Sequence, residues 1–188
     1  YTLKETRHLY GTYSSGMNLY NLPSSMMTAL TISVIPTVSA SLARNDRVHT
    51  ARVINSSLRV TGLMAFPMGL GLWALAEPIM KLCYPRYDSE LGGSLLAVLG
   101  IASMFVCLML ISNSILQSYG RVHVPVFTML IGGVVKIIFN YNLTAVPSIN
   151  IHAAPFGTLV CFVIVSSLNL FFVYRTMEDK PHYLRVFA

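Results

Sequence analysis

Long apolar stretches alternate with short polar connections along the whole chain. No Asp, Glu, Lys or Arg occurs between Leu9 and Ala43, and further apolar stretches cover about 60–82, 92–119, 124–143 and 154–174. The hydrocarbon core of a bilayer is roughly 30 Å thick, so a crossing helix needs about 20 mostly apolar residues. The pattern predicts an all-α, polytopic transmembrane bundle of about five spans. Residues 1–188 would form a single membrane domain with a polar tail at 175–188.

Prolines and glycines modify the first two predicted spans. Pro23 and Pro36 each remove an amide donor inside the first span, which predicts bending there. Pro67 and Pro78 interrupt the second span, which is still expected to be a packed helix. Room for a neighbouring backbone is expected in this span at Gly62, Gly69 and Gly71.

The composition agrees with a membrane protein. Hydrophobic residues make up 54% of the chain and charged residues 11%, whereas an ordinary soluble domain is about 25% charged. A soluble enzyme is therefore disfavoured. The net charge of +6 resides in the connections between apolar stretches and forms no aromatic-interleaved patch, so it does not indicate nucleic-acid binding.

The distribution of Lys and Arg predicts an orientation in the membrane. Alternate connections of a multi-pass chain share a side, and positively charged short loops stay in the cytoplasm. The connection at 44–59, the turn at Arg121 and the tail from Arg175 carry twice as many Lys and Arg as the amino-terminal segment, the 81–90 loop and the link around Pro147. We therefore expect an external amino end and a cytoplasmic carboxyl tail in the cell membrane.

Catalytic and metal-binding patterns are missing from the sequence. There is no Gly-rich phosphate loop and no nucleophile elbow, and the carboxylates lie in connections. All the histidines fall at or near span ends, where an interfacial role outweighs metal binding. Cys83, Cys107 and Cys161 are too widely spaced for a metal motif and imply no disulfide framework. We expect no enzyme activity, no cofactor and no metal.

Lys136 is the one formal charge well inside a predicted span. A cation at that depth is costly unless it faces water, protein or a ligand, which makes Lys136 the first functional candidate. The alternative is that its long side chain reaches an interface or pairs with a backbone carbonyl.

Two polar faces are further candidates. Asn113 and Gln117 are four residues apart and share one face of the third span. A polar stripe that is expected to face inward runs along the first span through Asn18, Asn21, Ser25 and Thr28. Each of these two faces could line a water-filled pathway or hydrogen-bond to neighbouring helices, and the sequence leaves both interpretations open.

Six ordered pieces of the chain carry a family resemblance. They are Leu19-Tyr-Asn-Leu-Pro23, Val34-Ile-Pro36, Leu75-Ala-Glu-Pro-Ile79, Ile115-Leu-Gln-Ser-Tyr-Gly-Arg121 with Pro125, Gly133-Val-Val-Lys-Ile-Ile-Phe-Asn140, and Pro147-Ser-Ile-Asn-Ile-His152. Together they resemble the polysaccharide and lipid-linked oligosaccharide flippases of the superfamily that also holds the multidrug and toxin extrusion transporters. Within it, the resemblance is nearest to the stage V sporulation protein B type.

The resemblance implies a fold and a function. Members of this family have two six-helix lobes around a central cavity and move a lipid-linked sugar by alternating access. This chain resembles most of the second lobe, so the first lobe of the same protein would be its partner, together with the lipid bilayer. The implied cargo is a bacterial, undecaprenyl-linked sugar for the cell envelope or spore wall. The candidate substrate-pathway residues are Lys136, Asn113, Gln117, Asn18, Asn140 and Arg121, and by the resemblance Lys136 matches a lysine common in the sporulation-type branch.

One departure from the family pattern narrows the range of expected substrates. Lipid II flippases of this superfamily carry an Asp-Arg pair shortly before the proline of the first span, where this chain has Met17 and Asn18. The departure argues against lipid II as the cargo. Two alternatives remain: cation-coupled multidrug efflux, which would want a mid-span carboxylate that this chain lacks, and a non-transporting membrane scaffold or fragment.

Overall fold

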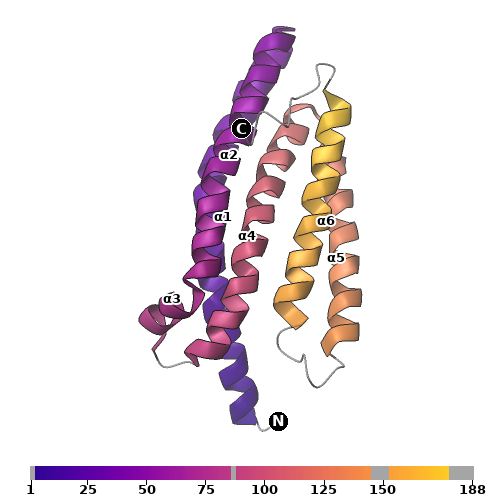
Figure 1. Cartoon of the computed structure of the whole chain (residues 1–188). Coiled ribbons are helices and arrows are strands. Elements are labelled where there is room, and N and C mark those ends of the chain that lie inside the picture. The colour runs from indigo at the N-terminus through magenta and orange to yellow at the C-terminus, as the bar shows by residue number, and fades with distance from the viewer. Residues whose placement is uncertain (1–2, 86–87, 145–152, 178–188) are drawn as a thin grey trace.

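A computed structural model describes residues 3–85, 88–144 and 153–177, which form a helical bundle (Figure 1). The helices are α1 (Leu3–Ala43), α2 (Arg47–Ala74), α3 (Ala76–Cys83), α4 (Ser89–Ser118), α5 (His123–Thr144) and α6 (Ala153–Thr176). The predicted all-α polytopic class is confirmed, and no strand occurs in the described ranges.

Four helices are long and apolar enough to cross a membrane, over Tyr10–Ala43, Ser89–Ser118, His123–Asn142 and Ala154–Thr176. These stretches lie along the apolar ranges expected at 9–43, 92–119, 124–143 and 154–174. The fifth candidate is the bent pair of α2 and α3, which is either a broken span or a re-entrant loop. The tail beyond Met177 and the Pro147–His152 piece lie outside the described residues.

The polar connection expected at 44–59 is mostly helix, which corrects the sequence-based boundary. Only a short turn at 44–46 separates α1 from α2. Asn45 adopts a positive φ of 55°, a conformation that Asn tolerates better than most residues. Asp46 then caps α2 by accepting a hydrogen bond from the His49 amide at 2.9 Å. Arg47 to Arg59 therefore extend the helix of the second span.

The second span expected at 60–82 is not one helix. The chain bends by 75° between α2 and α3. Pro78 has no amide hydrogen, and its ring would clash with the carbonyl four residues earlier, at Ala74, which is where α2 ends. Pro67, Pro23 and Pro36 lie inside continuous helices.

Helix α4 is the centre of the bundle and packs against α1, α2, α3 and α6 (Figure 1). Its contact with α2 uses two glycines, because a Cβ on Gly69 would lie 2.8 Å from the Gly100 carbonyl oxygen. The close approach expected at Gly69 is confirmed. The one expected at Gly71 is wrong, since a Cβ there would meet open space.

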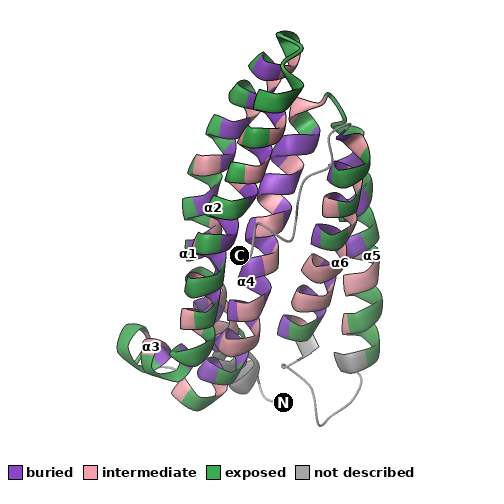
Figure 2. Ribbon diagram, turned by 45° about the horizontal axis from the view of Figure 1, so that its top comes forward, coloured by how far each residue is buried: buried purple, intermediate pink, exposed green. Residues whose placement is uncertain are grey.

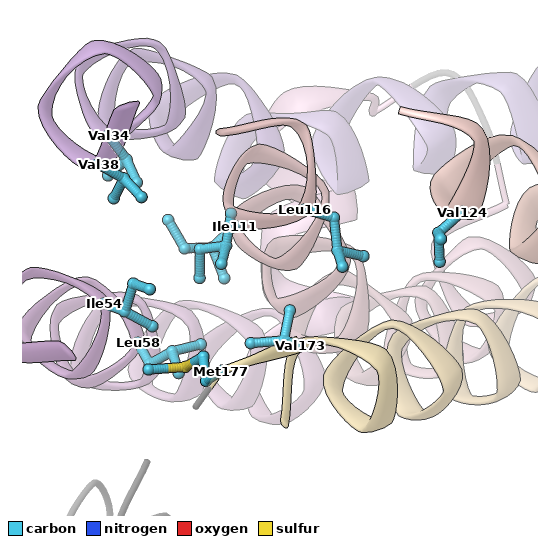
Figure 3. Packing of buried hydrophobic residues seen from close by; sticks show 10 residues of the cluster. Val34, Val38, Ile54, Leu58, Ile111, Leu116, Val124, Val173 and Met177 are labelled. Carbon is cyan, nitrogen blue, oxygen red and sulfur yellow. The ribbon is translucent and has the colours of Figure 1, made fainter. Parts of the chain in front are cut away.

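Helix α6 changes its neighbours along its length. Near the carboxyl end of α6, Val173 and Met177 join a buried cluster with Ile54 and Leu58 of α2 (Figure 3). Near its start, Cys161 and Val165 instead cluster with Tyr20 of α1. Both clusters also hold residues of α4, and α6 packs mainly against α4 and α5.

Candidate functional site

The polar stripe of α1 faces away from the other described helices. Asn18, Asn21, Ser25 and Thr28 are all exposed. Within the described bundle the stripe therefore packs against no other helix, and a substrate cavity in front of it stays a prediction. The reason is that α4 takes the opposite, apolar face of α1, where Tyr20, Met27, Val34 and Val38 are buried.

The hydroxyl and amide side chains of the stripe differ in whether they have a hydrogen-bond partner. Ser25 donates to the Asn21 carbonyl oxygen at 2.8 Å and Thr28 to the Ser24 carbonyl oxygen at 2.9 Å. Such internal bonds make a hydroxyl tolerable in an apolar medium. The exposed side-chain amides of Asn18 and Asn21 make no hydrogen bond within the described part of the chain. A primary amide facing hydrocarbon without a partner is costly, so this face suits water or another polar surface.

The exposed face of α5 is apolar, whereas the exposed side of α1 combines the polar stripe with the exposed side chains of Leu22, Met26 and Ile32. Phe127, Leu130 and Ile137 are 63%, 61% and 69% exposed, and the neighbouring exposed residues are also apolar. Bulky apolar side chains at membrane depth suit lipid chains. Helices α1 and α5 lie on opposite sides of the bundle, with α4 and α6 between them (Figures 1 and 2).

A hydrogen-bonded network joins three helices inside the bundle. Asn169 of α6 is fully buried, and its side-chain amide donates to Asn113 Oδ1 of α4 at 2.6 Å. Thr128 of α5 donates to Asn169 Oδ1 at 2.6 Å. The interhelical bonding that the sequence left open for Asn113 is therefore present. Sequence reasoning missed Asn169 and Thr128, although an Asn inside an apolar span was the signal that pointed to Asn113.

Lys136 lies on the seam between α5 and α6. Contacts along this seam pair Thr128 with Asn169, Gly132 with Val165, and Asn140 with Gly157, at steps of four and then eight residues on each helix. This antiparallel register places Lys136 opposite Cys161. Lys136 is half-buried, which fits a position at the edge of the seam.

Asn140 lies one turn beyond Lys136 on the same face of α5. Its Oδ1 atom rests against Gly157 and is buried with no hydrogen-bond donor among the described residues.

The remaining candidates lie at the end of the bundle where α1 meets α2. Gln117 and Arg121 are both exposed. Arg121 lines a cavity of about 340 Å³ together with Leu42, Asn45, Asp46, Arg47, Thr50, Ala51, Tyr119, Thr176 and Met177. The turn after α1, the turn after α4 and the end of α6 thus meet here, as expected of connections on one side of a membrane.

The six sequence-based candidates do not form one cluster. Asn18 belongs to the α1 stripe, Asn113 to the three-helix network, Lys136 and Asn140 to the α5–α6 seam, and Gln117 and Arg121 to the end of the bundle. Within the described ranges, no three His, Cys, Asp or Glu side chains could hold a metal ion.

Comparison with known proteins gives three matches. The MatE family model matches residues 10–142. In Bacillus subtilis (strain 168), the uncharacterized membrane protein YabM is 25% identical over 168 residues, which is 89% of this chain and 31% of YabM. The lipid II flippase MurJ of the same organism is 24% identical over 127 residues, which is 66% of this chain and 23% of MurJ.

The chain therefore spans less than a third of the length of either relative. Its apolar helices and its membrane-protein relatives make it part of a multi-pass membrane protein. Because the family model covers more than half of the chain, this protein belongs to the MatE family.

Proposed function

We propose that this chain forms one wall of the transport pathway in a membrane flippase that moves a lipid-linked sugar across the cytoplasmic membrane. The observation that carries the proposal is the exposed polar stripe of α1, on a bundle whose α5 side is suited to lipid. Membership of the MatE family and similarity to a lipid II flippase support the transporter class.

The rest of the full-length protein supplies the opposite wall. The stripe needs water or a polar surface in front of it. In each relative, the part of the chain outside the matched region is more than twice as long as the matched region itself. A first lobe facing α1 would enclose the stripe in a water-filled cavity. Rocking of the two lobes would then open the cavity to one side of the membrane at a time.

The chemistry of the stripe suits a sugar headgroup. The side-chain amides of Asn18 and Asn21 can each donate and accept hydrogen bonds, as sugar hydroxyls do. No covalent bond changes during such transport. Because Met17 and Asn18 stand where lipid II flippases carry an Asp-Arg pair, the proposed cargo is an undecaprenyl-linked oligosaccharide or polysaccharide precursor other than lipid II. A role in spore-wall assembly belongs to the same proposal.

Flipping by the full-length protein tests this function. The protein is placed in liposomes with a fluorescent lipid-linked oligosaccharide, and lectin accessibility reports its translocation. The double substitution Asn18→Leu and Asn21→Leu should slow flipping at least tenfold, because sugar contacts and water are lost along the wall. Asn142→Leu is the control, since Asn142 is also exposed but lies near the end of α5.

Each outcome has a defined meaning. Equal flipping by the double variant and the wild type would remove α1 from the pathway. No flipping of any lipid-linked sugar by the wild type would contradict the proposed function. Proton- or sodium-dependent dye efflux by that same preparation would then identify multidrug efflux, and absence of both activities would favour a scaffold.

A further inference from the structure

The cavity at Arg121 lies in a step at one end of the bundle. Helices α1 and α2 project there beyond the end of α4 (Figure 1), and their residues 43–49 are exposed (Figure 2). The end of α4 is held against α1, because the Ser118 hydroxyl donates to the Ile35 carbonyl oxygen at 3.3 Å. The cavity is therefore enclosed by the projecting turns of α1 and α2 on one side and by the ends of α4 and α6 on the other.

The lining of this cavity carries two cationic side chains. They are Arg47, in the first turn of α2, and Arg121, in the turn after α4. Asp46 also lines the cavity, but its Oδ1 atom accepts a hydrogen bond from the His49 amide, and no ion pair joins Asp46 to Arg121 in the described ranges. The charge of Arg121 is therefore available to a ligand.

The wider surroundings of the cavity are cationic as well. Arg44, Arg52 and Arg175 are exposed at this end of the bundle, and Asp46 is the one carboxylate in its described turns and helix ends. The distribution of Lys and Arg predicts that this end is cytoplasmic. The cytoplasmic leaflet carries anionic phospholipids, and basic pockets between spanning helices on that side bind lipid headgroups.

The size and the apolar part of the lining favour a lipid over an inorganic ion. Small-molecule sites have volumes of roughly 300–1,000 Å³, so a cavity of about 340 Å³ has room for a headgroup. Apolar surface is supplied by Leu42, Ala51 and Met177. An inorganic anion would leave this surface without a partner, whereas a phospholipid places its glycerol and first acyl carbons against it.

We propose that this cavity binds the headgroup of an anionic phospholipid, with its phosphate next to Arg121 and Arg47. A guanidinium group donates two parallel hydrogen bonds to a phosphate, which suits arginine to this contact. The bound lipid would link the turn between α1 and α2 to the ends of α4 and α6, and so stabilise this arrangement of helices. The site is separate from the polar stripe of α1 and does not rest on the proposed flippase function.

Lipid titration of the full-length protein tests the site. Phosphatidylglycerol or phosphatidylcholine is added to the protein in neutral detergent, and native mass spectrometry and the melting temperature report binding. Phosphatidylglycerol should bind more tightly and raise the melting temperature more. Arg121→Ala should weaken its binding about fivefold, as expected for one arginine near an anionic lipid. Thr176→Phe should weaken it as well, because the ring fills part of the cavity without changing its charge.

Two controls separate a defined site from general attraction to a basic surface. Arg59→Ala removes the same charge from an exposed position of α2 outside the cavity, and it should bind phosphatidylglycerol as the wild type does. Arg121→Lys keeps the charge and should retain most of the binding. Melting temperatures in phosphatidylcholine alone, equal to that of the wild type, show that the variants are folded.

Three results would overturn the inference. The first is unchanged affinity for phosphatidylglycerol in both Arg121→Ala and Thr176→Phe. The second is an equal loss of affinity in Arg59→Ala, which would show a diffuse attraction by the whole cationic end. The third is displacement of the lipid by soluble glycerol phosphate at the same concentration, which would identify a site for a soluble phosphate compound.

Discussion

Asn169 connects more helices than any other residue whose bonds are described here. Asn169 lies on α6. Its side-chain nitrogen donates to Asn113 on α4, and its side-chain oxygen Oδ1 accepts from Thr128 on α5. A buried amide satisfied on both sides fixes the rotation of the helices that carry its partners. The network accounts for Asn113 as a packing residue in this conformation.

Replacing Asn169 should therefore cost stability. Hydrogen bonds between membrane helices contribute about 0.6 kcal/mol on average and up to about 1.7. We expect Asn169→Leu, which removes two bonds, to destabilise the full-length protein by about 1 to 2 kcal/mol, and Thr128→Val by about 0.6 kcal/mol. Thermal unfolding in nanodiscs measures both. An Asn169→Leu protein as stable as the wild type would show that the network contributes nothing.

Two adjacent glycines of α5 provide a paired prediction. A Cβ on Gly132 would lie 3.0 Å from Cys161 Sγ and would also press on Val165, whereas a Cβ on Gly133 meets open space. Gly132→Ala should destabilise by about 1 to 3 kcal/mol through overpacking of the seam. Gly133→Ala should be neutral or stabilising by up to about 1 kcal/mol, because alanine favours helix. The reverse order of melting temperatures would contradict the register between α5 and α6.

At the scale of elements, the bend between α2 and α3 is held by packing as well as by Pro78. Met80 of α3 is fully buried and rests against Gly92 of α4. Gly93 of α4 packs against the backbone of Glu77, whereas the Glu77 side chain is exposed. Sequence reasoning recognised the proline but kept one helix over 60–82, because hydrophobic periodicity carries no information on where a chain turns away from its axis.

Gly93 should be sensitive to the smallest enlargement. A Cβ there would lie 2.9 Å from Glu77 Cα, so α3 would have to move away from α4. We expect Gly93→Ala to cost about 1 to 3 kcal/mol. Ser94→Ala is the control, since Ser94 is exposed on the same turn of α4. If both variants unfold at the wild-type temperature, the contact between α3 and α4 is looser than described here.

At the scale of the whole molecule, the exposed side of α1 carries a polar stripe, whereas the exposed side of α5 is apolar. The apolar stretches were readable from the sequence because a bilayer imposes a length and a composition on each span. The stripe at Asn18, Asn21, Ser25 and Thr28 was also readable as one face of a helix. The direction in which the stripe faces could not be read from the sequence, because it depends on which side of α1 packs against α4. The neighbour that we expect in front of the stripe belongs to the rest of the protein.

The same reasoning explains why the predicted site did not assemble. Lys136 and Asn18 were both recognised as polar groups at membrane depth, but one-dimensional spacing does not place residues of different helices. Their helices, α5 and α1, lie on opposite sides of the bundle, with α4 and α6 between them (Figure 1). Asn18 and Lys136 therefore do not belong to one site in this bundle.

Water accessibility of the two sides tests the central proposal most directly. Single cysteines are placed at Asn18, Asn21, Ser25 and Thr28 on α1 and at Val134 and Ile137 on α5, in full-length protein in membranes, with Cys83, Cys107 and Cys161 replaced by alanine. A polar maleimide should label the α1 positions at least tenfold faster than the α5 positions, because thiolates form in water and not in lipid. Equal, slow labelling of both helices would contradict a water-filled pathway along α1.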